Sequence, residues 1–354
     1  MFRKILMTRR LNGLLLVVTG LATAAFSQLP PESPLAAAAS TQPVTVAFIG
    51  DQRPGAGARA VLEMIKAQHV DMVLHQGDLG YGKGPAAWDE LITEILGGDF
   101  PYFASIGNHD IEDWRERNGY QAKLRARLHR IPGARCSGDL GVMSACTFKG
   151  LFFILSGVGT LPKNSPDDPR HIAYLRDQLA RTNAIWRICS WHKNQARMQT
   201  GRKGNAVGWQ PYEICRKAGA IIATAHEHAY SRTYLMDNFE TQSVVSTDNT
   251  LVISSGRSFA FVSGLGGASV RSQKHGGPWW AAVYTSDQNA DFGALFCTFN
   301  SHGNPRRADC HFQDIQGRIP DRFSIISRVG AEGTVAPAVG SPASTPRTEE
   351  QLAD

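Results

Sequence analysis

The sequence predicts an α/β protein, in which central β-structure is flanked by helices within a single domain. Short apolar runs that end in polar residues alternate with stretches of helical period, which is typical of strands linked by helical crossovers. No fixed-period repeat is present, so one domain is the simplest interpretation. The 354 residues, 42% hydrophobic and 19% charged, can bury a sizeable core, which excludes a wholly disordered chain and a polytopic membrane protein.

The predicted elements follow in three groups. Strands and helices alternate in the first group, which consists of Val44–Ile49, Ala58–Gln68, Met72–His75, Ala86–Leu96 and Tyr102–Ile106. The same alternation returns after Gly150, with Leu151–Leu155, Ile172–Leu179, Trp186–Ser190, Tyr212–Lys217 and Ala220–Thr224. From Arg232 to Phe312 the chain becomes strand-rich, with strands expected at Leu251–Ser254, Phe259–Val262, Ala281–Thr285 and Ala294–Phe299.

Both ends of the chain differ in composition from the predicted domain at 45–325. Residues 1–24 combine basic residues, a short apolar run and small residues, as an export signal does, and 25–44 are a linker rich in Pro, Ala and Ser. Residues 326–354 predict a disordered tail. We therefore expect a secreted or periplasmic protein without a stable membrane span once the signal is removed. A retained N-terminal anchor is the alternative. Export could use the general or the twin-arginine pathway.

The charge balance argues against a polyanionic partner. Of the formal net charge of +6, four units come from Arg3, Lys4, Arg9 and Arg10 in the expected signal. About +2 is left for the mature chain, so no nucleic-acid partner is implied. The sequence does not predict an oligomeric state.

The six cysteines are expected to form disulfides if the protein is exported, because an oxidising compartment favours disulfides. Local spacing favours Cys136 with Cys146, and Cys297 with Cys310 across a predicted hairpin. Cys189 and Cys215 remain as the third pair. Buried free thiols are the alternative.

Potential metal ligands follow several predicted strands, at the points where ligands collect in α/β folds. Two carboxylates, three imidazoles, an amide and a phenol occur there, namely Asp51, Asp78, Tyr81, Asn108, His192, His226 and His228. A single metal ion does not need so many ligands. Two ions held roughly 3.5 Å apart and bridged by one carboxylate would use the whole set.

In order, these motifs resemble the calcineurin-like metallophosphoesterases: Gly-Asp, Gly-Asp-x-x-Tyr, Gly-Asn-His-Asp, a strand-end His and His-x-His. Tyr81 and the run from His226 to Arg232 look like the purple acid phosphatase branch. The resemblance covers about residues 45–315. It implies a four-layer α/β/β/α sandwich of two packed mixed sheets flanked by helices.

The resemblance also implies roles for individual residues. Asp51, Tyr81 and His228 would hold Fe(III), whereas Asn108, His192 and His226 would hold a divalent Fe, Zn or Mn. Asp78 would bridge the two ions, and His109 would face the phosphate as a donor or acid. If Tyr81 is instead a core tyrosine, the protein becomes an ordinary di-metal phosphoesterase.

The sequence departs from this branch where substrate would bind. Arg53 stands where the branch commonly has glycine, and it could reach a phosphate oxygen or face solvent. Members of the branch often have a further substrate-binding histidine in the interval between His192 and His226, but this sequence has none there. The role of that histidine could be taken by Lys193 or Gln195, our candidate contacts, or by one of three later basic residues, Arg197, Arg202 and Lys203. The glycine-rich segment 199–208 predicts a flap or a plain surface loop.

The interpretation is a secreted or periplasmic acid phosphatase-like enzyme that hydrolyses small phosphate monoesters through a metal-bound hydroxide. One alternative is a phosphodiesterase or nucleotide hydrolase at the same site. The other is a secreted binding protein that kept the fold without catalysis. Gly266–Ser269 is interpreted as a turn between strands, and Glu227 as a residue that lies behind the ligands or at the surface.

Overall fold

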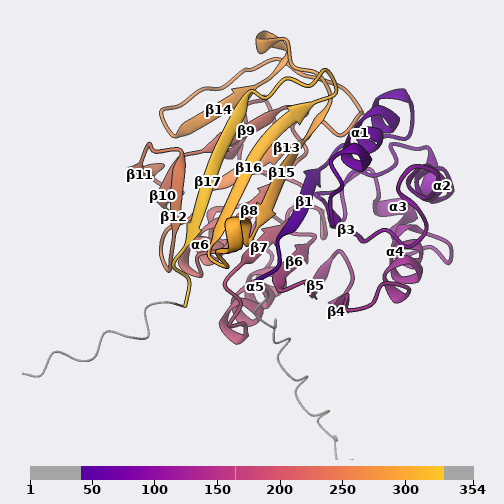
Figure 1. Cartoon of the computed structure of the whole chain (residues 1–354), viewed down its shortest axis with the longest axis horizontal. Coiled ribbons are helices and arrows are strands. Elements are labelled where there is room, and N and C mark those ends of the chain that lie inside the picture. Colours follow the sequence, from indigo (N-terminus) through magenta and orange to yellow (C-terminus); the bar gives the residue numbers. More distant parts are fainter. Residues whose placement is uncertain (1–40, 164, 331–354) are drawn as a thin grey trace, which may run out of the picture. The chain divides into compact units, whose positions relative to one another are not determined.

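Two mixed β-sheets lie next to each other at the centre of the fold, and helices pack against part of the outer face of each (Figure 1). The structure is a computed structural model that describes residues 41–163 and 165–330. The expected signal, most of the linker and the tail beyond residue 330 lie outside the described residues. The predicted α/β fold class, with two packed mixed sheets flanked by helices, is confirmed.

The first sheet has seven strands in the order β12-β17-β16-β15-β1-β2-β3. Their bounds are β1 Val44–Ile49, β2 Met72–His75, β3 Tyr102–Ala104, β12 Thr250–Ile253, β15 Gly293–Phe299, β16 Arg307–Asp314 and β17 Asp321–Ser327. Strands β1, β2 and β3 are parallel to one another, and β15 pairs antiparallel with β1. Strand β17 extends two residues past the expected domain boundary at 325.

The second sheet has eight strands in the order β14-β9-β13-β8-β7-β6-β5-β4. Their bounds are β4 Arg135–Asp139, β5 Met143–Phe148, β6 Leu151–Ser156, β7 Arg187–Ser190, β8 Ile221–Thr224, β9 Tyr230–Thr233, β13 Ala260–Ser263 and β14 Trp280–Tyr284. Strands β6, β7, β8 and β13 are parallel neighbours. Strands β10 (Leu235–Asn238) and β11 (Ser243–Ser246) form a separate hairpin.

Aromatic and polar contacts join the inner faces of the two sheets. The rings of Phe48 in β1 and Phe261 in β13 lie 5.2 Å apart, and those of Phe103 in β3 and Phe153 in β6 lie 4.8 Å apart. The Ser263 hydroxyl donates to the Phe48 carbonyl at 2.8 Å. These contacts hold the strand ends of the two sheets in a fixed relation.

The helices form because their apolar side chains recur at helical spacing. α1 (Ala56–Ala67) buries Ala58, Val61, Leu62 and Ile65, and α2 (Gly84–Leu96) buries Trp88, Leu91, Ile92 and Ile95. α3 (Ile111–Trp114) and α4 (Tyr120–His129) complete the layer on the first sheet, while α5 (Pro169–Arg181) and α6 (Trp209–Lys217) contact the second. Three short 3-10 helices lie at Ala196–Met198, Ser286–Gln288 and Ser301–Gly303.

All six cysteines are paired as expected, so the predicted disulfide connectivity is confirmed. Cys136 faces Cys146 across β4 and β5, and Cys297 faces Cys310 across β15 and β16. The third disulfide joins Cys189 in β7 to Cys215 in α6. It ties a helix of the outer layer to a central strand of the second sheet.

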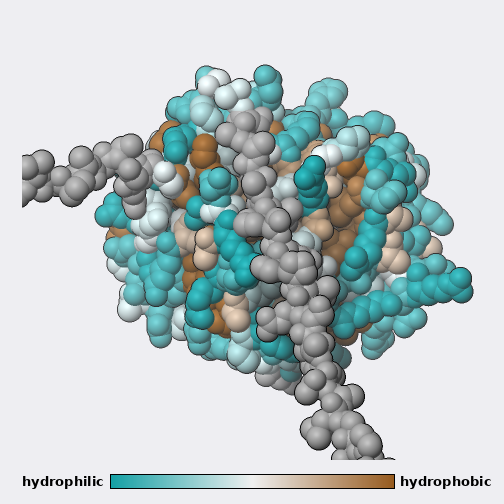
Figure 2. All heavy atoms as spheres, turned by 90° about the horizontal axis from the view of Figure 1, so that it is seen from below, coloured by the Kyte–Doolittle hydropathy of each residue, from teal (hydrophilic) through white to brown (hydrophobic). Residues whose placement is uncertain are grey.

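The described surface is largely hydrophilic. Figure 2 shows one face, on which hydrophilic residues predominate and smaller hydrophobic areas lie between them. Among the described residues, the only large hydrophobic side chains that are exposed are Val245 and Ile319. No helix in residues 41–163 or 165–330 has the length and apolar character needed to cross a membrane.

Candidate metal centre

Loops that follow five parallel strands, β1, β2, β3, β7 and β8, carry the predicted ligands. Backbone hydrogen bonds tie these loops together. The Asp51 N–H donates to the Gly77 carbonyl at 3.0 Å, and the Ala225 N–H donates to the His192 carbonyl at 3.1 Å. The carboxyl ends of strands from both sheets therefore meet, as expected of a site in an α/β fold.

Several of these residues have a strained backbone. Asp51, Asp78, Tyr81 and His226 have φ values of 58°, 61°, 45° and 69°, in the left-handed region that non-glycine residues rarely adopt. Such a conformation costs about 1–3 kcal/mol per residue and persists only where the surroundings enforce it. Four of the candidate ligands at these strand ends thus carry backbone strain.

Gly107 allows two of the loops to approach closely. A Cβ atom at this position would lie 2.0 Å from the Asp78 nitrogen and 2.1 Å from its Oδ1. Real atoms do not come so close, so a side chain would push the loop after β3 away from Asp78. The glycine before Asn108 is thus required by packing against the candidate bridging carboxylate.

One group of three side chains consists of Asp51, Tyr81 and His228. The Tyr81 hydroxyl lies 2.6 Å from Asp51 Oδ1 and 2.8 Å from His228 Nε2. His228 Nε2 lies 3.2 Å from the same Asp51 oxygen. A carboxylate, a phenol and an imidazole from the loops after β1, β2 and β8 thus converge on one point, and they are the three side chains that the resemblance assigns to one ion.

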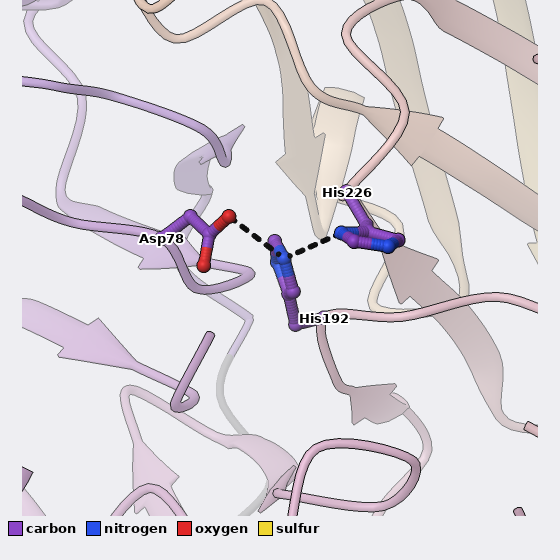
Figure 3. Close-up of side chains that lie close together, drawn as sticks. All are labelled: Asp78, His192 and His226. Carbon is purple, nitrogen blue, oxygen red and sulfur yellow. Dashed lines mark hydrogen bonds and ion pairs between the residues drawn. The ribbon is translucent and has the colours of Figure 1, made fainter. Parts of the chain in front are cut away.

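A second group consists of Asp78, His192 and His226 (Figure 3). His192 Nε2 lies 3.1 Å from Asp78 Oδ2 and 3.0 Å from His226 Nδ1. One ligand atom from each residue falls within 4.8 Å of the others. The carboxylate and the two imidazoles are a donor set that suits a divalent transition metal.

Asn108 provides an independent test of whether the site fits metal ions. Its Oδ1 atom is buried and has no hydrogen-bond partner among the described residues. A buried amide oxygen left without a partner costs about 1–3 kcal/mol, unless an ion or a water satisfies it. Asn108 follows β3 beside the second group, so an unpaired oxygen occurs where the sequence predicted a ligand.

The electrostatics also fit cations. Burial and the charges of Asp51 and Asp78 raise the pKa of the Tyr81 phenol well above its usual value. Burial raises the pKa of the Asp51 carboxyl, but the imidazoles of His228 and His192 lower it by more. The pKa of Asp51 therefore lies below the usual range. Ionised carboxylates beside a buried phenol are an environment in which a phenolate forms only next to a cation.

Two residues that the sequence analysis did not single out orient the imidazoles. His192 Nδ1 lies 2.8 Å from the Gln76 carbonyl, to which it donates, and its Nε2 is left free for a metal. His228 Nδ1 contacts the hydroxyl of Ser269, a residue we interpreted only as part of a turn. A backbone carbonyl such as that of Gln76 cannot be recognised as a histidine partner from the sequence. The role of Ser269 could not be recognised either, because it lies 41 residues from His228.

We expect Ser269→Ala to lower metal affinity about 10- to 100-fold, because the hydroxyl that orients the His228 ring is lost. Titration of the metal-depleted protein with Zn²⁺ measures the effect. Ser272→Ala, three residues along the same loop, is the matched control and should bind as the wild type does. Equal affinity in the two variants would show that Ser269 does not orient a ligand.

Asp110 is a further residue whose role was not predicted. Its buried carboxylate accepts from the N–H groups of Asp78, Leu79 and Gly107 at 2.8–2.9 Å. Burial and the charge of Asp78 raise the pKa of Asp110 to about 7. Asp110 therefore fixes the backbone on both sides of the centre, and no described contact places it among the ligands.

His109 lies at the edge of the centre. Its side chain is exposed, and its ring packs 4.4 Å from the Tyr81 ring, while its backbone N–H donates to Asp78 Oδ1 at 2.8 Å. The side chain therefore forms part of the accessible surface above the ligands. That position agrees with a contact to substrate.

The three candidate substrate contacts have different surroundings. Lys193 lines a pocket of about 330 Å³ together with His226 and Lys203. The Gln195 side chain accepts from the Arg197 N–H and caps the 3-10 helix at Ala196–Met198. Arg53 is exposed, with φ 52°, and its side chain makes no contact with the centre in the described part of the chain. Only Lys193 is brought beside a candidate ligand.

The segment 199–208 is fixed by hydrogen bonds to its surroundings. The Lys274 N–H donates to the Thr200 carbonyl at 2.7 Å, and the Val207 N–H donates to the Asn194 carbonyl at 3.3 Å. Glu227 is buried against this segment and forms an ion pair with Arg271 at 3.7 Å. The segment and Glu227 thus make a wall next to the ligand loop that follows β8.

Comparison with known proteins places this geometry in context. Residues 45–230 match the profile of the calcineurin-like phosphoesterases. No curated protein sequence matches the chain.

Several solved structures share the fold. The purple acid phosphatase PPD1 from seeds of yellow lupin (Lupinus luteus) aligns with a TM-score of 0.60 and 16% identity, over 80% of this chain and 54% of that one. This chain therefore spans about half the length of the lupin protein. GAP50, the anchor in the inner membrane complex of Plasmodium, aligns with a TM-score of 0.54 and 14% identity, over 81% and 89%. PhoD aligns with a TM-score of 0.50 and 13% identity, over 80% and 68%.

Proposed function

This chain belongs to the calcineurin-like phosphoesterase family, and from that premise we propose that it is an acid phosphatase-like enzyme that hydrolyses phosphate monoesters. The family implies a metal-dependent phosphoesterase. The supporting observation is the convergence of six side chains in two groups of three, beside the unpaired oxygen of Asn108. Two neighbouring groups, with Asp78 as the candidate bridge, fit the arrangement that two adjacent ions require.

The resemblance to purple acid phosphatases assigns the residues to two ions, and their chemistry supports that assignment. Asp51, Tyr81 and His228 would hold Fe(III), since an anionic phenolate and carboxylate favour a trivalent ion. Asn108, His192 and His226 would hold a divalent Fe, Zn or Mn, and Asp78 would bridge the two ions. When bound, the ions neutralise charge on the phosphoryl group and activate a water molecule as the nucleophile.

The remaining chemistry belongs to side chains of the chain itself. His109, exposed beside Tyr81, donates a proton to the leaving oxygen of the ester. Lys193, in the pocket next to His226, attracts the phosphate by its charge. Asp110 and Gln76 keep the ligand loops in place through the hydrogen bonds described above, so the centre needs little rearrangement during the reaction.

The covalent structure supports a compartment outside the cytoplasm. Three disulfides use all six cysteines, which is typical of proteins that fold in an oxidising environment. Together with the signal-like residues 1–24, they support the proposal of a secreted or periplasmic enzyme.

The substrate class is tested by comparing p-nitrophenyl phosphate with bis-p-nitrophenyl phosphate on the purified protein. We expect kcat/KM to favour the monoester by roughly tenfold or more, which corresponds to about 1.4 kcal/mol of transition-state binding. A preference for the diester would make the protein a phosphodiesterase at the same site. If the protein binds metal but hydrolyses neither ester, it works by binding alone.

The iron assignment is tested by Tyr81→Phe. A phenolate bound to Fe(III) absorbs visible light, so the wild type should be coloured and the variant colourless, with much of the fold kept. A visible spectrum and metal analysis measure this directly. Tyr120→Phe, a tyrosine outside the two ligand groups, should keep the colour. A colourless wild type that holds two zinc or manganese ions would reject iron and leave the phosphoesterase proposal intact.

A further inference from the structure

Lys203 lies between two adjoining pockets. On one side is the pocket of about 330 Å³ that contains Lys193 and the candidate ligand His226. On the other side lies a larger pocket of about 460 Å³, here called the basic pocket, lined by Arg202, Lys203, Glu227, Arg271 and Lys274. Lys203 belongs to the lining of both pockets, so the basic pocket adjoins the pocket that contains the candidate ligand His226.

The basic pocket has a large excess of positive charge. Four basic side chains face one carboxylate, that of Glu227, which pairs with Arg271. Within residues 41–163 and 165–330, the side-chain nitrogens of Arg202, Lys203 and Lys274 form no hydrogen bond or ion pair. Three cations are therefore left without a protein partner beside a site that handles anions.

The positions of these cations are set by the backbone around the metal centre. The Arg271 N–H donates to the carbonyl of the ligand His228 at 2.9 Å, and the Lys274 N–H donates to Thr200. A Cβ at Gly201 would come within 2.0 Å of Glu227 Oε2, so the segment packs directly against that carboxylate. The basic pocket is thus a built continuation of the site.

The environment of Lys203 agrees with an anion site. Burial lowers the pKa of Lys203 to about 8, although the charges of Asp51 and Glu227 act in the opposite direction. Partial burial of an unpaired ammonium costs free energy, which a bound anion would offset. The pocket that Lys203 shares with His226 places its side chain near the metal centre.

We propose that the substrate carries a second phosphate group, which binds in the basic pocket while the ester phosphate lies at the metal centre. This inference rests on the proposed function. Two arginines offer forked donors that match phosphate oxygens, and the excess charge is more than a single carboxylate would neutralise. Hydrolysis adds water across the ester P–O bond and releases inorganic phosphate and an alcohol that keeps the second phosphate.

Two non-hydrolysable probes test this without turnover: propylphosphonate and propane-1,3-bisphosphonate, titrated calorimetrically into the metal-loaded protein at low salt. We expect the bisphosphonate to bind about tenfold more tightly or better. A third probe, 4-phosphonobutanoate, replaces the second phosphonate by a carboxylate and should bind more weakly than the bisphosphonate. Equal affinity for the first two probes, or for the last two, overturns the proposal.

Variants separate the basic pocket from the metals, which a bisphosphonate could also contact. The double variant Arg202→Gln/Lys274→Gln removes two exposed cations that touch no candidate ligand, and it should abolish the preference. Lys217→Gln/Arg322→Gln removes the same charge from exposed positions outside the pocket and should keep it. A preference that survives in the first variant comes from the metals and contradicts the proposal.

The same data distinguish the two proposals. A protein that prefers the bisphosphonate through Arg202 and Lys274 but hydrolyses no ester retains the anion pocket and refutes the phosphatase function. A protein that hydrolyses monoesters but does not prefer the bisphosphonate keeps the phosphatase function and refutes the second-phosphate site.

Discussion

Asp78→Asn is expected to lower turnover of phosphate monoesters by roughly 10³-fold or more, since metal-ion stabilisation is worth several kcal/mol. Asp78 is buried, its Oδ2 faces His192 at 3.1 Å and its Oδ1 accepts from the His109 N–H. Asparagine has nearly the same shape but no charge, so two adjacent cations would repel each other without a bridging anion. Metal analysis of the variant should give less than one ion per chain.

The comparison variants decide whether Asp78 bridges. Asn108→Ala and His228→Gln each remove one ligand from one ion, so each should cost less activity than Asp78→Asn. Asp99→Asn, an exposed carboxylate paired with Arg130, should behave as the wild type. If Asp78→Asn keeps both ions and near-normal turnover, Asp78 is not the bridging ligand.

The sequence predicted the parts of the fold and the site that depend on local patterns. Continuous apolar strands and amphipathic helices are visible in short windows, so the strands around Phe48 and the helix containing Leu62 were expected within a few residues. The candidate ligands could be found because each lies just after a strand, where the chain must turn. Cys136 and Cys146 could be paired from their short separation in the sequence, and the structure places them opposite each other on neighbouring strands.

What the sequence could not predict depends on contacts between distant residues. Strands β16 and β17 alternate fully buried with mostly half-buried side chains, and β17 packs through Asp321, whose carboxylate pairs with the buried Arg232 of the other sheet. Ser269 and Asp110 support the centre through bonds to residues 41 and about 30 positions away. The neighbours of Lys203 come from three separate segments, so no window of sequence displays the basic pocket.

His109 provides the last prediction, because its surroundings allow its side chain to be removed without disturbing the ligands. Its link to the bridge is the backbone N–H, which alanine keeps, and its ring is exposed beside Tyr81. Positioned acid catalysis contributes about 10²- to 10⁴-fold, so His109→Ala should lower turnover of phenyl phosphate by roughly that factor. The loss should be smaller for p-nitrophenyl phosphate, whose leaving oxygen needs little protonation. Metal analysis should still find two ions.

The leaving-group dependence separates acid catalysis from simpler roles. His129→Ala, an exposed histidine on α4, should leave both rates unchanged. His109→Gln keeps a hydrogen-bond donor but supplies no acidic proton, so it should restore little activity on phenyl phosphate. Equal losses on both esters in His109→Ala would instead indicate an electrostatic contact to the phosphate, and a lost ion would make His109 a ligand. Because the N–H of His109 holds Asp78 in either variant, a change in metal content could arise only from the imidazole itself.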